Sequence, residues 1–274
     1  MIRFLASDID HTLYSHQLRK IPERNLSALL QLQQQGVRLI LATARIAMGV
    51  RTMAEQLKMA DYDGLIIASA GAELIHCASG HRTVLSSLSL PLIHQLFQFA
   101  AKHQVHLSVQ QRDWMIATGY DEALESDRRD VGIDFVVVGS DFFSYVKEPA
   151  CMAALTGTPQ LLDQIEPLAR AQLNDLTLTR SSREFLDITP LHVCKAAALR
   201  RILQENGLTA EALAAIGDGV NDVEMLQLAG LAAAPCSGSE QARKAADILT
   251  CSCEDGAVGE LAERILQYNR RQRP

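Results

Sequence analysis

The chain contains no apolar run of about eighteen residues, the length that a membrane-spanning helix requires. Its N-terminus enters a short apolar run directly, so it gives no sign of a secretory signal. Basic residues are not in excess, because the formal net charge is −6 at pH 7. A nucleic-acid partner normally demands a basic face. We therefore expect neither a membrane nor a nucleic acid as a partner.

The six cysteines form no Cys-x-x-Cys pair and lack the spacing of a zinc site. Free thiols suit a reducing compartment, so we expect a cytoplasmic protein. The sequence shows no internal repeat and no low-complexity tract. With 274 residues, 48% apolar and 21% charged, the chain can bury a sizeable core, and its length favours two domains.

Two aspartates, Asp8 and Asp10, follow the short apolar run of residues 2–6. Such a run predicts a buried strand, and open α/β sheets bind their ligands at the carboxyl edge of the strands. Side chains two residues apart on an extended segment point the same way, so both carboxylates can face one reacting centre. They suit a divalent metal, or a nucleophile together with a proton carrier. They could equally be ordinary strand-end or capping acids, and distant residues have to decide.

A second apolar run, residues 37–42, ends in Thr43, Ala44 and Arg45. Gly36 closes the helical stretch 22–35 that precedes it, so the predicted order is helix, turn and strand. A hydroxyl and a guanidinium therefore follow this strand, as the two acids follow the first.

Lys195 lies beyond a strand predicted over residues 185–188, which Pro190 is expected to end. An alanine-rich helix begins near the lysine. A cation at a helix start opposes the macrodipole, which favours acids there. This placement indicates a bound anion, although a solvated surface lysine fits the sequence as well.

The run 213–216 predicts a fourth strand that leads into a glycine-bracketed acidic loop containing Asp218, Asn221 and Asp222. Glycines let such a loop turn tightly and bring its backbone close to a ligand. Asp222 could merely cap the following helix, and Asp218 could start an Asx turn. Four polar clusters, each at a predicted junction of strand and helix, are an improbable coincidence.

The order of these clusters resembles the haloacid dehalogenase (HAD) superfamily: Asp-x-Asp-x-Thr, a strand-end threonine, a lysine, then Gly-Asp-Gly-x-Asn-Asp. Within it, the chain is similar to the Cof-type phosphatases (subfamily IIB), which carry a large α/β cap of the C2 kind. The similarity covers residues 1–77 and 185–274. It implies an α/β fold with a HAD-like Rossmannoid core, a parallel sheet and an inserted cap domain.

The resemblance implies a nucleophilic role for Asp8, while Asp10 protonates the leaving alcohol and later activates water. It also implies that Mg²⁺ is held by the Asp8 carboxylate, the Asp10 backbone carbonyl and Asp218. Asn221 and Asp222 would support this metal shell.

By the same resemblance, Thr43 and Lys195 would hold the phosphoryl oxygens. Transfer of a phosphoryl group to a carboxylate brings two anions together, so a divalent cation and a lysine are needed to neutralise the charge. A small set of aspartates suits Mg²⁺ better than histidines or thiols do.

The chain departs from the family pattern close to these groups. His11 stands where glycine is usual, Ala44 replaces a common glycine, Ala70 replaces an asparagine, and Ala196 replaces a glycine. None of these changes removes a catalytic group. We expect His11, Ala44 and Arg45 to be possible contacts of the phosphate or the substrate.

Residues 79–185 alternate between strand-like and helix-like segments without a catalytic constellation, so we expect them to form an inserted α/β cap that selects the substrate. Residues 1–78 and 186–274 would form the discontinuous core. Arg112 and Arg180 are candidate substrate contacts, although both could be surface charges. Trp114 is a third candidate contact, although for this sole tryptophan we favour a place in the cap core. The segment 121–134 is expected to be a charged loop, and residues 269–274 to be frayed.

The resemblance therefore implies a Mg²⁺-dependent phosphatase acting on small organic phosphomonoesters, such as sugar phosphates, pyridoxal phosphate or flavin mononucleotide, through an aspartyl-phosphate intermediate. A phosphomutase of the same superfamily and a non-catalytic phospho-ligand binding protein remain alternatives. A receiver-type signalling module fits less well, because the acid pair comes at residue 8 and the insertion is long.

Overall fold

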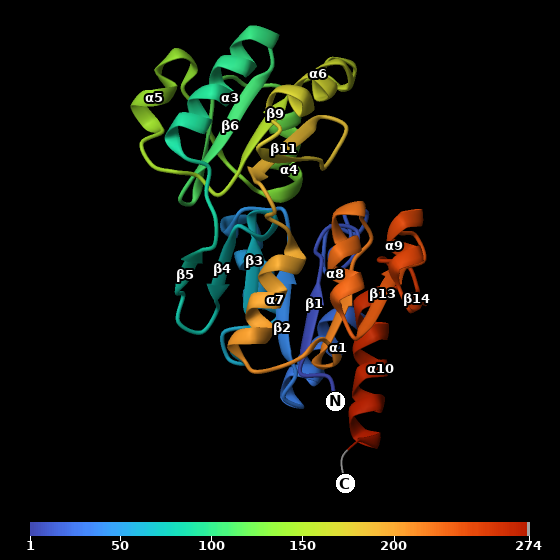
Figure 1. Ribbon diagram of the computed structural model, residues 1–274. Coiled ribbons are helices and arrows are strands. Elements are labelled where there is room, and N and C mark those ends of the chain that lie inside the picture. The colour runs from blue at the N-terminus through green and yellow to red at the C-terminus, as the bar shows by residue number, and fades with distance from the viewer. Residues whose placement is uncertain (273–274) are drawn as a thin grey trace. The chain divides into compact units, whose positions relative to one another are not determined.

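The computed structural model describes residues 1–272 and divides into two units. Unit 1 contains Met1–Arg45, Val50–Thr83 and the chain from Cys194 onward, and unit 2 contains Ile46–Gly49 and Val84–Val193. Both units are mixed α/β structures (Figure 1). No helix within the described residues is long and apolar enough to cross a bilayer.

Unit 1 is built on an eight-stranded sheet with the order β14-β13-β12-β1-β2-β3-β4-β5. Its strands from β14 to β3 pair in parallel, and β4 pairs antiparallel to β3. The strands are β1 (Phe4–Ser7), β2 (Arg38–Ala42), β3 (Leu65–Ala68), β4 (Glu73–His76), β5 (Arg82–Val84), β12 (Leu213–Ile216), β13 (Leu231–Pro235) and β14 (Ile248–Thr250).

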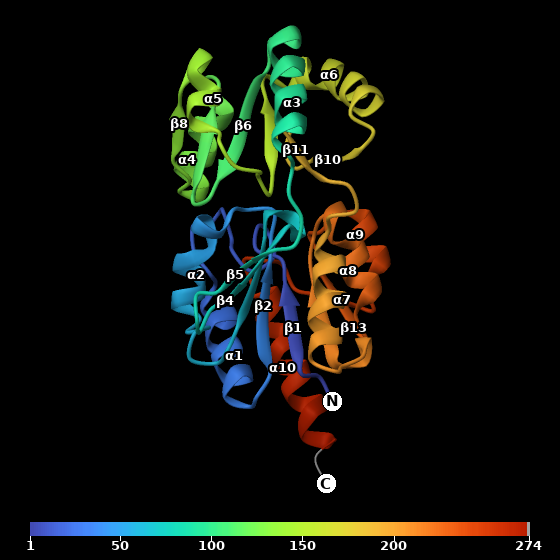
Figure 2. The same cartoon turned by 60° about the vertical axis from the view of Figure 1, so that its left-hand side comes forward.

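Helices cover both faces of this sheet, as parallel strands require. Figure 2 shows α1 on one side of the sheet and α7 and α8 on the other. The long helix α10 packs against α1. The helices of unit 1 are α1 (Glu23–Gln34), α2 (Arg51–Gln56), α7 (Lys195–Glu205), α8 (Val223–Leu228), α9 (Glu240–Ala245) and α10 (Ala257–Arg271).

Strand β1 lies in the middle of the sheet, between β12 and β2, and all four of its residues are buried. Because these three strands are parallel, the residues that follow them emerge at one edge. Asp8, Thr43 and Asp218 follow β1, β2 and β12 in this way. The expected edge of polar side chains is therefore present.

Unit 2 has a six-stranded, mostly antiparallel sheet with the order β10-β11-β9-β6-β7-β8. Its strands are β6 (His106–Gln111), β7 (Trp114–Ala117), β8 (Phe135–Val137), β9 (Ala153–Thr156), β10 (Leu176–Arg180) and β11 (Phe185–Pro190). Its helices are α3 (Leu90–His103), α4 (Glu122–Val131), α5 (Phe142–Tyr145) and α6 (Pro159–Gln172).

One face of this sheet carries the apolar core of unit 2. Leu107, Leu155 and Leu186 point to that face and are fully buried with Leu96 of α3 and Leu162 of α6. Apart from Phe185, the alternate positions of the same strands carry polar or small side chains, as the period of two residues demands.

The boundaries of the two units differ from the expected domain boundaries by several residues. Residues 79–83 belong to unit 1, because β5 is part of the larger sheet. Residues 186–193 belong to unit 2, because β11 pairs with β9 and β10. Pro190 is the last residue of β11 rather than a residue beyond its end, which a strand terminus tolerates.

The prediction of a charged loop over 121–134 is wrong, because residues 122–131 form α4. Asp121 caps this helix by accepting a hydrogen bond from the Leu124 backbone N–H at 3.0 Å, and Gly132 ends it with a φ of 76°. Trp114 is also not in the core, since it is 51% exposed.

The prediction of a frayed tail fails at Asn269, which is buried at the end of α10. Its amide accepts from the N–H and donates to the carbonyl of Ile2, both at 2.9 Å, and so ties the two ends of unit 1 together. Residues 273 and 274 of that tail lie outside the described part of the chain.

Candidate active site

Asp8 extends the pairing of β1 by one residue, because its backbone N–H donates to the Ile216 carbonyl of β12 at 2.9 Å. This fixes its backbone at the edge of the sheet. Its side chain is buried beside Lys195 and the acids of the 217–222 loop. Burial, together with the charges of Asp222 and Asp218, raises the pKa of Asp8 well above its usual range, although Lys195 opposes the rise.

Lys195 is the first residue of α7 and is only 2% exposed. Its Nζ lies 2.5 Å from Asp8 Oδ1 and 2.6 Å from Asp222 Oδ1. Burial alone would lower the pKa of the ammonium, but the two carboxylates outweigh burial and raise it. Lys195 is therefore a buried, charged lysine beside the carboxyl ends of β1 and β12 and not a solvated surface residue.

Asp8, Asp218 and Asp222 each place a carboxylate oxygen within 4.8 Å of the others. Three carboxylates and one ammonium leave two negative charges without a counterion when all the groups are ionised. Oxygen donors and a deficit of two charges fit Mg²⁺. Asp222 thus lies inside this cluster, whereas Asn221 is exposed.

Thr12 positions Asp218 from the opposite loop. Its hydroxyl is fully buried and donates to Asp218 Oδ1 at 2.7 Å. The other acid of the loop, Asp222, accepts a hydrogen bond from the Gly219 N–H at 2.9 Å. Sequence reasoning included Thr12 in the Asp-x-Asp-x-Thr motif but did not assign it this role, which depends on a contact between residues 206 positions apart.

Asp10 is held by two side chains. Arg45 donates to Asp10 Oδ2 from Nε at 2.9 Å and to Oδ1 from Nη2, and Oδ1 also lies 2.6 Å from His16 Nε2. Burial raises the pKa of the Asp10 carboxyl, but the contacts with His16 and Arg45 outweigh burial and bring it below the usual range. Arg45, expected as a phosphate contact, is thus engaged with Asp10, and sequence reasoning missed His16.

His11 has an exposed side chain and a left-handed backbone with a φ of 58°. Its ring lies beside that of His16, with the centroids 4.8 Å apart. Burial raises the pKa of the nearby Asp218 carboxyl, and a positive charge on His11 would oppose that rise. The usual glycine of the family suits this conformation better, because an L side chain is strained there.

Thr43 is buried directly beyond β2, and its Oγ1 accepts a hydrogen bond from the Arg45 backbone N–H at 3.1 Å. The hydroxyl proton of Thr43 stays available to donate to an anion. Ala44 is half-buried and offers only its backbone to a ligand.

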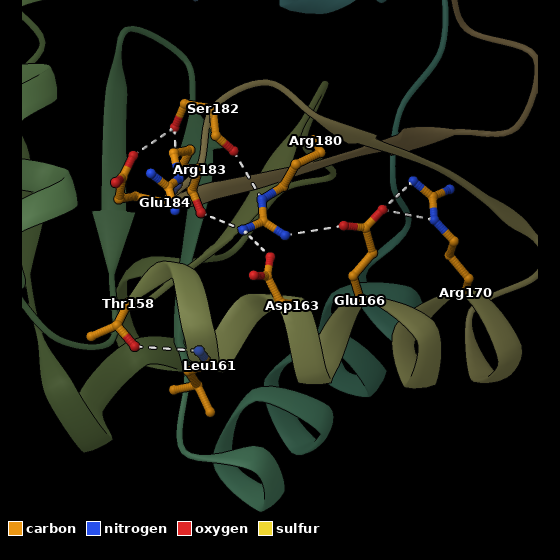
Figure 3. A network of polar contacts seen from close by, with 9 residues as sticks. All are labelled: Thr158, Leu161, Asp163, Glu166, Arg170, Arg180, Ser182, Arg183 and Glu184. Atoms are coloured by element: carbon orange, nitrogen blue, oxygen red, sulfur yellow. Dashed lines mark hydrogen bonds and ion pairs between the residues drawn. The ribbon is translucent and has the colours of Figure 1, made fainter.

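The two candidate arginines of unit 2 behave differently. Arg180 donates to Glu166 Oε2 at 3.0 Å and to Asp163 Oδ1 at 3.2 Å, so it ties β10 to α6 (Figure 3). Its guanidinium is occupied by these carboxylates, and we favour a structural role for it over the expected substrate contact. Arg112 is 79% exposed and pairs with Glu148 at 3.1 Å.

Comparison with known proteins agrees with this geometry. The model of the haloacid dehalogenase-like hydrolase family matches residues 5–261. The phosphatase YcsE of Bacillus subtilis (strain 168), named for 5-amino-6-(5-phospho-D-ribitylamino)uracil, is 24% identical over 97% of this chain and 96% of its own length.

Two solved structures share the fold. A haloacid dehalogenase-like hydrolase from Bacteroides thetaiotaomicron has a TM-score of 0.90 and 26% identity, covering 97% of this chain and 100% of that one. The HAD subclass IIB sugar phosphatase BT4131 has a TM-score of 0.84 and 19% identity, covering 96% and 98%. The chain therefore belongs to the haloacid dehalogenase-like hydrolases and has the Cof-type, subclass IIB fold.

Proposed function

We propose that this chain is a Mg²⁺-dependent phosphatase of small organic phosphomonoesters, with Asp8 as the nucleophile. The observation that carries the proposal is the cluster at the carboxyl ends of β1 and β12, in which Asp8, Asp222 and Lys195 are buried and Asp218 is half-buried. A lone carboxylate repels a phosphate dianion. A carboxylate that is paired with a buried ammonium and lies beside a cation site can approach the phosphate.

In the first step, a carboxylate oxygen of Asp8 bonds to phosphorus as the bond between phosphorus and the alcohol oxygen breaks. Lys195 and Thr43 donate hydrogen bonds to the phosphoryl oxygens, where charge accumulates. The departing alcohol oxygen takes its proton from Asp10. When bound by the carboxylates of Asp8 and Asp218, with Asp222 beside them, Mg²⁺ supplies positive charge that offsets the repulsion between the two anions.

In the second step, the oxygen of a water molecule attacks the phosphorus of the aspartyl phosphate while Asp10 takes a proton from that water. The bond between phosphorus and the Asp8 carboxylate breaks, which releases inorganic phosphate and restores Asp8. The carboxylate form of Asp10, which His16 and Arg45 favour, is the form that this step needs.

The substrate class is part of the proposal. Sugar phosphates and phosphorylated cofactors, such as pyridoxal phosphate or flavin mononucleotide, are the expected substrates. The phosphatase YcsE, named for a ribityl phosphate compound, supports a small phosphorylated molecule. We expect no nucleic-acid or membrane partner.

A phosphate-release screen with Mg²⁺ against a panel of these phosphomonoesters tests the function. We expect hydrolysis of several of them, no hydrolysis with excess chelator, and no hydrolysis by Asp8→Asn. An isomerised product without net release of phosphate would instead identify a phosphomutase. Binding of these compounds without any turnover would identify a phospho-ligand binding protein.

A further inference from the structure

The loop that follows Asp10 brings a histidine to the proposed acid/base. His16 Nε2 lies 2.6 Å from Asp10 Oδ1, and the side chains of these residues are 28% and 34% exposed. The same oxygen also accepts a hydrogen bond from Nη2 of Arg45, and the other oxygen accepts one from Nε of Arg45 at 2.9 Å. Nitrogen groups therefore hold both oxygens of Asp10, and they come from two separate segments of the chain.

His16 does not lie on a freely moving loop. Its neighbour Ser15 is fully buried, and the Ser15 hydroxyl donates to Glu254 Oε1 at 3.0 Å. Backbone hydrogen bonds between Ser15 and Lys20, at 3.1 and 3.3 Å, close the turn that carries His16. The backbone that carries the imidazole of His16 is thus held in place by these hydrogen bonds.

Tyr14 supports the arrangement from the side. Its ring meets the His16 ring edge to face, with the centroids 5.3 Å apart, and the Arg45 guanidinium lies 5.7 Å from the Tyr14 ring centre. One aromatic ring therefore contacts both side chains that bind Asp10. Its contacts restrict the rotamers of both partners.

We propose that His16 is a positioning residue for Asp10, which sets the direction in which that carboxyl presents its oxygens to the leaving group and to water. The inference rests on the proposed function, since it assigns His16 to the proton-transfer step of that reaction. A partner that orients a catalytic group typically contributes tenfold to a hundredfold to activity.

Leaving groups provide the readout. An alkyl alcohol is a poor leaving group and depends on protonation by Asp10, whereas an aryl alcohol depends on it little. We expect His16→Ala to lower kcat on an alkyl phosphate such as glycerol phosphate by about tenfold or more. Its kcat on 4-nitrophenyl phosphate should change by less than about threefold.

Three further variants make the test specific. His16→Gln keeps an N–H donor near the place of Nε2 and should recover most of the lost activity. His16→Ala added to Asp10→Asn should cause no further loss, because the group that it positions is already gone. His81→Ala, at an exposed histidine of the same unit, is the matched control and should retain wild-type activity on both substrates.

Equal losses on both phosphates, no loss on either, or a full additional loss in the Asp10→Asn background would overturn the role of His16. Thermal unfolding of each variant separates these results from misfolding, and His16→Gln gives a second variant if His16→Ala does not fold. Failure of the proposed function looks different: the wild type would release phosphate from neither substrate, or Asp8→Asn would stay active.

Discussion

The ammonium of Lys195 lies 2.5 Å from a carboxylate oxygen of Asp8, although the two residues are 187 positions apart in the chain. The same ammonium reaches Asp222 at 2.6 Å, and all three side chains are buried. This contact couples the stability of unit 1 to its proposed chemistry.

Replacing the ammonium should destabilise the protein. In Lys195→Met, two buried carboxylates lose their counterion, so we expect the free energy of unfolding without Mg²⁺ to fall by about 3 kcal/mol or more. Urea unfolding at neutral pH measures this. Lys244→Met is the matched control, because Lys244 pairs at 2.6 Å with Glu240 where both side chains are exposed, and that loss should stay below about 1 kcal/mol. Similar losses in the two variants would show that the buried ion pair contributes no more to the free energy of unfolding than the exposed one.

Mg²⁺ should raise the thermal unfolding temperature, because a ligand that binds only the folded state stabilises it. Asp218→Asn should lose this rise. Without metal, this variant should be at least as stable as the wild type, since it removes one of three crowded negative charges. Asp61→Asn, at an exposed acid of unit 1, should respond to Mg²⁺ as the wild type does. A full Mg²⁺ response in Asp218→Asn would place the metal elsewhere.

The strand-end groups were predictable from the sequence because their chemistry depends on local order. A short apolar run followed by acids, a hydroxyl or glycines indicates the carboxyl end of a buried strand, and parallel strands bring such ends together. Asp8, Thr43 and Asp218 were found in this way. The helical position of Lys195 followed from its alanine-rich neighbours.

Contacts between distant loops were not predictable in the same way. The partners of Asp10 come from the turn at His16 and from Arg45, and nothing in their spacing indicates that they meet. Thr12 reaches Asp218 only because β1 and β12 are adjacent. The helix α4 is a different case: Asp121 and Gly132 are ordinary cap signals, but the density of charge between them favours a solvated loop.

The turn after β3 yields a pair of opposite predictions. Ala70 has a left-handed φ of 57°, so Ala70→Gly should raise the free energy of unfolding by about 1 kcal/mol. A Cβ on Gly71 would overlap the carbonyl oxygen of Cys194, the residue before Lys195. Gly71→Ala should therefore cost about 2 kcal/mol or more and lower activity by displacing the start of α7. Urea unfolding measures both changes, and a neutral Gly71→Ala would contradict the close approach.

The stability of unit 2 should depend on pH through Asp187 of β11. Burial, reinforced by the charge of Asp127, raises the pKa of Asp187 from 3.8 to about 7, although a hydrogen bond with Ser181 opposes the rise. Folded unit 2 thus holds a proton that the unfolded chain has already released, and this stabilisation is lost as pH rises from about 4 to about 7.

Between about pH 5 and about pH 8, Asp187 should remove about 2.5 kcal/mol from the free energy of unfolding. Asp187→Asn should lose less stability than the wild type over the same range, because the amide does not titrate. The sole tryptophan, Trp114 in β7 of the same sheet, reports urea unfolding of this unit by its fluorescence. Parallel pH dependences in the two proteins would show that Asp187 is ionised in the fold.

The central claim is that phosphorus bonds to Asp8 during turnover, and chemical trapping tests it most directly. Borohydride reduces an acyl phosphate to an alcohol, so rapid quenching with borohydride during hydrolysis should convert Asp8 to homoserine, which peptide mass spectrometry locates. We predict homoserine at position 8 in samples with substrate and Mg²⁺, and aspartate at position 8 when substrate is omitted. Reduction at a different carboxyl group, or undiminished phosphate release by Asp8→Asn, would contradict the account.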